Sequence, residues 1–397
     1  TYAAVELVNH LITYLGTVSG LSKEQRKDPA TLRSYAHQFA ARAFRRPLDA
    51  EQQERFVDSR FNHQPDPMVA LRHSMLLVLT SPRFLYPGLA DNNGRPDNFT
   101  VASRLALTLW DGLPDKKLLH AAGEGSLQSP EQITTQIQRM ILSNKTRRKM
   151  QGFFREWLAL DEQHDLRKDP DLFPGFDERL VRDLRRSLEH FVDEVVWSDR
   201  SDYRDLLLNK NIFLNERLAT FYGAEPLQGE ALRKVTLPNR PNSGILTHPF
   251  LLAAHAYHNN TSPIHRGVFI SRNVLGRLLK PPVEAVAFKD DEFDPALTMR
   301  EKITQLTKAT SCMECHRVIN PVGFSLENFD AVGRHRLEDN RKPVDTVTRY
   351  VNENEREIPI RSIHDVATMA AGSRLAHEAF ITHPVSYTHL TLPTTEA

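Results

Sequence analysis

Two cysteines and a histidine form the segment of this sequence whose spacing points to specific chemistry. Cys312 and Cys315 are the only cysteines among the 397 residues, and His316 follows the second one directly. Two thiols three positions apart on a helical turn reach the two vinyl groups at one edge of a porphyrin, and the next imidazole then lies under the iron. The spacing therefore predicts one covalently attached haem c, with thioether bonds from both cysteines and His316 as the proximal iron ligand.

Four other roles of such a cysteine pair remain open at this point. A structural zinc site usually takes four ligands, and the sequence holds no second CxxC pair. A redox-active dithiol is typical of a βαβ context, and a disulfide across so short a loop adds little stability. The cysteines can also simply be small buried side chains.

The flanks of the motif predict how it is positioned. Asp294 followed by Pro295 is typical of a helix start, and we expect a helix through Met299 that leads into the motif. The pair Asn320 and Pro321 is expected to end the short turn that carries the cysteines. A backbone carbonyl near these two residues is expected to accept the Nδ1 proton of His316 and so to fix the ring.

Most of the remaining chain has helical periodicity. Apolar residues recur every three or four positions between 180 and 195, between 137 and 141, and between 153 and 158. Helices are also expected over 35–44, ending before Pro47, from Asp49 through Phe56, from Asp66 to a stop at Ser81 and Pro82, over 105–110 and over 130–142. Because no alternating strand pattern of any length separates them, we predict a mainly α fold: a multi-helix platform followed by a cytochrome-c-like haem module.

Clusters of proline and glycine at 87–96, 223–241 and 280–295 suggest domain boundaries. We expect an N-terminal helical domain over 1–90, a central helical domain over 91–240 and the haem-binding region over 241–384. Residues 385–397 include VSYTHLTLPTT, which matches the translation of a sequencing adapter and is expected to be an artefact. The start at Thr1 is expected to be a cut.

Composition removes several classes of function. The 51 basic and 50 acidic side chains leave a formal charge of +1, so no overall basic field favours nucleic acid or an acidic membrane. The longest stretch without Asp, Glu, Lys or Arg, 241–265, contains proline, asparagine and four histidines, so it is a poor membrane span. We expect a folded chain with no membrane span and no nucleic-acid partner.

The segment 312–336, CMECHRVINPVGFSLENFDAVGRHR, resembles the haem-attachment region of the cytochrome-c-like multidomain proteins abundant in planctomycetes and related bacteria. Further stretches resemble the same family in the same order: FAARAFRRPLDAEQ, LTSPRFLY, ASRLALTLWDGLPDKKLL, GILTHPFLLAAHAYHNNTSPIHRGVF, and the pair Pro281-Pro282. The resemblance covers residues 30 to about 383. It implies an exported, largely helical protein built from consecutive domains of unknown function, and it supplies no activity.

The sixth position of the iron and the haem propionates need partners that the motif does not provide. His265, within TSPIHRG, is our first candidate for the sixth ligand, so we expect His265 and His316 to bind the iron from its two sides. The other candidates are Met299, His255, His258, His364, His377 and His383, each of which is more often a structural residue. Arg334 and Arg336 are predicted to bind the propionates, with Arg317 and Arg266 also in reach by sequence, while Glu327 and Asp330 are expected to form salt bridges with those arginines.

We therefore predict a c-type haem protein of the periplasm or cell envelope that passes single electrons to or from a redox partner protein there. Two alternatives remain. One is a haem enzyme acting on peroxide or an organic substrate at an open iron position, which leaves an enzymatic activity undecided. The other is a structural protein that binds an envelope partner and carries the haem as an ancillary group.

Overall fold

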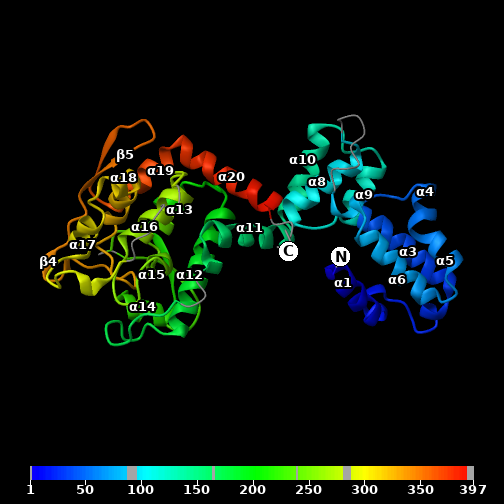
Figure 1. The fold of residues 1–397 in the computed structure, drawn as a ribbon, viewed down its shortest axis with the longest axis horizontal. Helices are drawn as coiled ribbons and strands as arrows, with labels where there is room; N and C mark the ends of the chain where they lie inside the picture. The colour runs from blue at the N-terminus through cyan, green and yellow to red at the C-terminus, as the bar shows by residue number, and fades with distance from the viewer. Residues whose placement is uncertain (1, 87–95, 163–165, 238–239, 280–287, 391–397) are drawn as a thin grey trace. The chain divides into compact units, whose positions relative to one another are not determined.

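The computed structural model of the chain describes residues 2–86, 96–162, 166–237, 240–279 and 288–390, the last eight of these by their backbone alone. It is mainly helical, as predicted from the sequence (Figure 1). The helices are α1 (Tyr2–Thr13), α2 (Leu15–Ser19), α3 (Pro29–Phe44), α4 (Ala50–Gln53), α5 (Ser59–His63), α6 (Pro67–Leu79), α7 (Pro82–Leu85), α8 (Asn98–Trp110), α9 (Lys116–Gly123), α10 (Pro130–Ile141), α11 (Asn144–Trp157), α12 (Glu178–Val196), α13 (Asp205–Leu208), α14 (Glu216–Tyr222), α15 (Pro249–Ala254), α16 (Pro263–Phe269), α17 (Met299–Leu306), α18 (Thr310–Phe324), α19 (Ile363–Gly372) and α20 (Arg374–Leu390). The strands are β1 (Asn211–Leu214), β2 (Arg233–Thr236), β3 (Glu338–Asp339), β4 (Lys342–Pro343), β5 (Thr348–Val351) and β6 (Glu357–Ile360).

The described strands form three separate antiparallel pairs: β1 with β2, β3 with β4, and β5 with β6. The described residues therefore contain no parallel sheet. The pair Pro281-Pro282 and the residues beyond 390 lie outside the described part of the chain.

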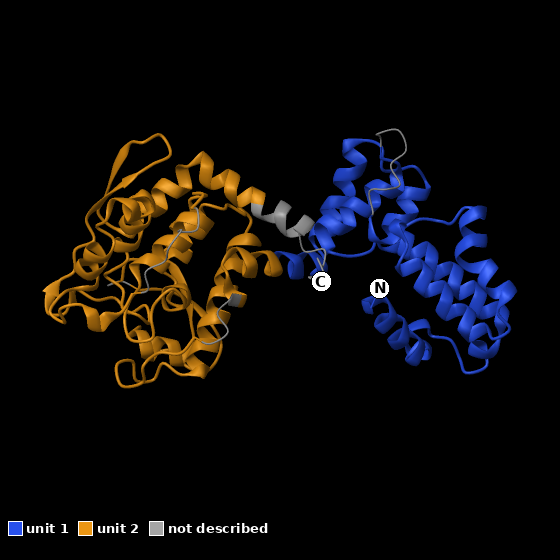
Figure 2. Ribbon diagram, in the orientation of Figure 1, with its two compact units in different colours: residues 1–150 blue, residues 151–397 orange. Residues whose placement is uncertain are grey.

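The chain divides into two compact units, residues 1–150 and 151–397 (Figure 2). The domain boundaries expected near 90 and 240 fall inside these units, and they stay predictions. Unit 1 holds two separate hydrophobic clusters. One is formed by α1, α2, α3, α5, α6 and α7 together with Phe56 and Val57, and the other by α8, α9 and α10.

The helices in and beside the first cluster begin and end where their capping residues predict. The side chain of Asp66 accepts hydrogen bonds from the first backbone N–H groups of α6, and Pro67 takes the first helical position, where no N–H is needed. Asp49 caps α4 in the same way, and α3 ends at Phe44, three residues before Pro47. The helix that begins at Asp49 runs on beyond the expected Phe56, through a π-helical turn into α5. Such caps each contribute about 1 kcal/mol, so these boundaries are set locally.

Unit 2 is built around α12. Its apolar side chains, spaced three and four apart, are buried as predicted: Leu180, Leu184, Leu188, Phe191, Val192 and Val195. On the same buried face, the hydroxyl of Ser187 donates to the carbonyl oxygen of Phe213 in β1 and thereby fixes α12 on the β1–β2 pair. Helices α14 and α15 pack on α12 as well.

His248 caps α15 from inside this core. Its Nδ1 accepts the backbone N–H of Phe250 at 3.3 Å, and its Nε2 lies 3.1 Å from the Ser187 hydroxyl oxygen. Because that hydroxyl already donates to Phe213, the imidazole Nε2–H is the donor. Burial, followed by the charge of Arg240, lowers the pKa of His248 to about 3.

This histidine makes stability depend on acid. Between pH 6.5 and pH 3 the unfolded chain binds a proton at His248 and the native protein does not, so the free energy of unfolding falls as the pH falls through this range. One such group contributes a slope of about 1.4 kcal/mol per pH unit. His248→Asn keeps a side-chain acceptor for the helix cap and removes the titrating ring. As the pH falls, we expect the free energy of unfolding of this variant to decrease less steeply than that of the wild type, by about 1.4 kcal/mol per pH unit. Urea unfolding at pH 7, 5.5 and 4.5 measures it, and parallel losses in the two proteins would contradict the assignment.

Among the described residues, none of the helices combines the length and the apolar character that a membrane span requires.

Candidate functional site

Helix α18 carries the cysteine–histidine motif. Positions 312, 315 and 316 differ by three and four residues, so Cys312, Cys315 and His316 lie on one face of this helix. Both thiols are free and partly exposed. The structure thus brings together the three residues that the sequence predicts to act together.

A chain of hydrogen bonds fixes the imidazole of His316. Its Nδ1 lies 2.8 Å from the side-chain oxygen of Asn320, one helical turn further on. The amide nitrogen of Asn320 donates to the hydroxyl of Thr307 at 2.9 Å, and that hydroxyl donates to the carbonyl of Ile303 at 2.8 Å. Since Thr307 gives its only hydroxyl proton to Ile303, the amide of Asn320 must donate to Thr307 and present its oxygen to the ring. Nδ1 therefore carries the proton, and Nε2 keeps its lone pair.

The expected acceptor for this proton, a backbone carbonyl near Asn320 or Pro321, was wrong. Asn320 is buried, and its side chain takes that role. The cause is that α18 does not end there: it continues to Phe324 with Pro321 inside it. In a continuing helix the backbone carbonyls point along the axis to residues further on, so the ring finds a side-chain acceptor instead.

A close crossing of α16 and α18 accompanies the continuation of α18 past its proline. A Cβ atom on Gly323 would lie 2.0 Å from the carbonyl oxygen of Pro263, and one on Gly267 would lie 2.3 Å from that of Ile319. The two helices thus touch backbone to backbone at two glycines. A proline within a helix costs about 3 kcal/mol, and contacts of this kind offset it where local preference alone predicts a stop.

The helix before the motif begins later than expected. Asp294 bonds only the turn at Ala296, whereas Thr298 caps α17 in a reciprocal capping box with Glu301. Met299 is buried in the cluster that α17 forms with Phe324, which confirms its interpretation as a core methionine. Helix α17 supplies Thr307 at its end, so its placement determines the support of His316.

The candidate sixth ligand His265 lies on α16. Helix α16 touches α18 at Pro263 and Gly267, and His265 lies midway between these positions, on the opposite side of the helix. Its ring contacts Tyr257 at 5.2 Å between centroids. The structure therefore does not direct His265 toward the motif face of α18, and its role as a ligand stays a prediction.

The other candidate histidines are distributed over unit 2. His255 stacks on Phe269 with 4.4 Å between ring centroids, and His377 bonds the carbonyl of Ala371 at 2.9 Å. His258 and His364 are exposed, and the side chain of His383 is outside the described part. No group of three or more His, Cys, Asp or Glu side chains suited to a metal ion occurs among the described residues, so the zinc alternative finds no four-ligand set there.

The arginines proposed for the propionates have protein partners. Arg336 donates to Glu327 at 3.0 Å and to Asp339 at 2.8 Å, so the predicted salt bridge with Glu327 is present. Arg334 lies over the ring of Phe221, 4.0 Å from its centroid. Asp330 accepts the backbone N–H of Arg334, so its carboxylate caps the turn after α18. A propionate-binding role for Arg334 and Arg336 stays a prediction.

Of the two further arginines within sequence reach, one is buried and one is exposed. Arg266 is 1% exposed and donates to the backbone carbonyls of Leu252, Leu326, Phe329 and Asp330. Arg317 is exposed and pairs with Glu355 at 2.8 Å, which links α18 to the turn between β5 and β6. Arg266 is therefore a structural cation of the core, and its TSPIHRG segment is held by it.

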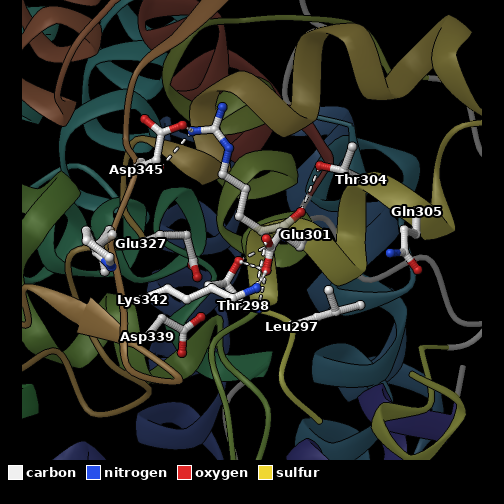
Figure 3. Close-up of a pocket in the computed structure, with 12 residues that line it drawn as sticks. Leu297, Thr298, Glu301, Thr304, Gln305, Glu327, Asp339, Lys342 and Asp345 are labelled. Carbon is white, nitrogen blue, oxygen red and sulfur yellow. Dashed lines mark hydrogen bonds and ion pairs between the residues drawn. The ribbon is translucent and has the colours of Figure 1, made fainter. Parts of the chain in front are cut away.

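A cavity of about 410 Å³ lies beside α17 and the β3–β4 pair (Figure 3). Its lining residues include Glu327 but none from α18. Figure 3 shows Lys342 and Thr298 directed at the carboxylate of Glu301, and Arg300 pairs with Asp345 at 3.2 Å. Both cations that line the cavity, Lys342 and Arg300, are thus already paired with carboxylates. We find no feature among the described lining residues that would select a particular ligand.

Two family models match consecutive parts of the chain. Residues 97–224 match PSD4, described as a protein of unknown function (DUF1592), and residues 242–339 match PSCyt3, described as a protein of unknown function (DUF1588). The chain thus contains two consecutive domains of these families, whose names are those of planctomycete cytochrome-c-like proteins, and the second match includes the whole motif on α18. No curated protein matches the chain, and no solved structure matches it.

Proposed function

We propose that this chain holds one covalently attached haem c on α18 and passes single electrons to or from a redox partner protein in the cell envelope. The observation that carries the proposal is the tautomer of His316. Its Nδ1–H donates a hydrogen bond to the side-chain oxygen of Asn320, so the lone pair of Nε2 is free to bind a metal. The two free thiols lie on the same helical face. This donor set fits a covalent haem.

The haem, when bound, supplies the one-electron chemistry. The chain's own residues hold and tune it. Cys312 and Cys315 would fix the porphyrin edge along α18. His316 would bind the iron, and its hydrogen bond to the buried amide of Asn320 makes the ring a stronger donor than an unbonded imidazole.

Electron transfer is favoured over chemistry on peroxide because the cations that would assist bond cleavage are occupied. Arg266 is committed to backbone carbonyls, Arg336 to two carboxylates, and Arg317 to Glu355. Because haem c is attached outside the cytoplasm, the proposal includes a periplasmic or envelope location.

Production of the chain together with a haem-attachment system tests the proposal. We expect a coloured protein whose mass includes one haem and whose pyridine haemochrome spectrum is that of a c-type haem. The double variant Cys312→Ser, Cys315→Ser removes both bonds and should be colourless, with the mass of the polypeptide alone. Glu314→Gln changes one of the two positions between the cysteines but keeps both thiols and His316, and it should retain the haem.

Two results would contradict the proposal. A wild-type chain without the added mass would remove the haem, and a haem-loaded chain whose reduced iron binds carbon monoxide readily would favour an open position and thus the enzyme alternative.

A further inference from the structure

A hollow of about 320 Å³ on unit 2 is lined by four arginines. Arg179, Arg182 and Arg186 come from α12, and Arg217 comes from α14. The three positions on α12 are three and four residues apart, so they lie on one exposed face of that helix. Helices α12 and α14 pack against each other, which brings Arg217 to the same place (Figure 1).

A buried carboxylate organises one side of this hollow. Asp183 accepts the amide of Asn215 at 2.8 Å and forms an ion pair with Arg217, and its side chain is 9% exposed. Arg186 lies further away, 3.8 Å from the same carboxylate. Arg217 is therefore fixed in its direction by the protein, and Arg186 is only loosely held.

The other two arginines, Arg179 and Arg182, have no partner among the residues that the structure describes. Neither Arg179 nor Arg182 makes a hydrogen bond or ion pair with any residue in the described part of the chain. This is not general for α12, because the neighbouring Arg185 pairs with Asp161 at 3.2 Å and with Glu189 at 3.4 Å. The described lining of the hollow has four arginines and two acids, Asp183 and Glu230, so it carries two surplus positive charges in a chain whose formal charge is +1.

A second hollow, of about 550 Å³, shares Arg217 and Glu230 with the first and is lined by Leu180 and Phe221. Guanidinium groups bind phosphate oxygens in a bidentate manner, and a phosphate monoester carries between one and a half and two negative charges at neutral pH. The two surplus positive charges thus match the charge of a phosphate monoester. The apolar side chains of the adjoining hollow could contact the organic group of the ester.

We propose that these two hollows form a binding site for an organic phosphate monoester, with the phosphate held by Arg179, Arg182 and Arg217 and the organic part lying against Phe221. The site uses no residue of α18, so it is independent of the proposed haem.

Isothermal titration of the full chain at constant ionic strength tests this proposal, with phenyl phosphate as the probe. We expect Arg179→Gln and Arg182→Gln each to weaken binding at least about tenfold, because a hydrogen-bonded ion pair to the phosphate is lost. Arg185→Gln is the matched control: it removes the same charge from the same helix outside the hollow, and it should change the affinity by less than about twofold.

Two further probes identify the ligand class. Phenyl sulfate, which carries one charge fewer, and inorganic phosphate, which lacks the ring, should both bind more weakly than phenyl phosphate. Equal affinity for inorganic phosphate would overturn the ester and leave a site for the free ion. Absence of binding at millimolar phenyl phosphate, or equal weakening by Arg185→Gln, would overturn the site itself.

Discussion

Arg266→Met is expected to lower the free energy of unfolding by about 3–5 kcal/mol, because it removes a buried cation on which several backbone groups depend. The guanidinium donates to four carbonyl oxygens: that of Leu252 in α15 and those of Leu326, Phe329 and Asp330 in the turn after α18. Burial lowers the pKa of Arg266 to about 10, so it is charged at neutral pH. Methionine fills similar volume but leaves these oxygens unsatisfied in the core.

The loss of Arg266 also affects a buried carboxylate. Glu327 is 2% exposed and has Arg266 on one side and Arg336 on the other, at 3.9 and 3.0 Å. Burial raises the pKa of Glu327, and the charges of Arg336 and Arg266 oppose this shift. Without Arg266 the pKa of Glu327 should rise further, and its buried negative charge becomes less favourable. Urea unfolding at neutral pH measures the effect. Arg272→Met, an exposed position a short distance along the chain, should cost less than about 0.5 kcal/mol, and equal losses in the two variants would contradict the role of Arg266.

Gly323→Ala is expected to cost about 3 kcal/mol, at the upper end of what overpacking usually costs. The new Cβ would lie 2.0 Å from the carbonyl oxygen of Pro263, and both atoms belong to rigid helical backbone. No side-chain rotation relieves such a contact, so α16 and α18 have to separate along their shared surface.

A second glycine provides the matched control. Gly372 lies at the end of α19, and a Cβ there meets no atom within 4 Å. Gly372→Ala should therefore leave stability unchanged or raise it by up to about 1 kcal/mol, since alanine favours the helix. Thermal unfolding of both variants gives the comparison. A Gly323→Ala protein as stable as Gly372→Ala would show that the two helices are not in contact as described.

Helix boundaries could be predicted from the sequence where the residues that set them are neighbours. The pair Asp66-Pro67 fixes the start of α6, and Asp49 fixes that of α4, because a cap acts on N–H groups two or three residues away. Pro321 was read wrongly because its tolerance within α18 depends on Pro263 and Gly267, more than fifty positions earlier. A helix start at Asp294 was wrong because the capping box at Thr298 and Glu301 is the stronger local signal.

The candidate site divides in the same way. The motif on α18 is local, so its three residues share a face as expected. The relay through Asn320 to Thr307 was missed, although the four-residue spacing from His316 to Asn320 was the signal that a continuing helix would have made visible. The arginine hollow was missed as well: three of its arginines lie at helical spacing on α12, but Arg217 and Asp183 meet only through tertiary packing.

The backbone contact between α16 and α18 also limits how the motif responds to a change of charge. Gly267 and Gly323 leave the two helices no room to slide, and Asn320 ties the imidazole of His316 to the end of α17. If an electron arrives at or leaves that face, the polypeptide around it has little freedom to rearrange, and most of the adjustment falls to solvent. If the proposed haem is bound there, the polypeptide's own share of the reorganisation energy would be small, which a flexible loop would not provide.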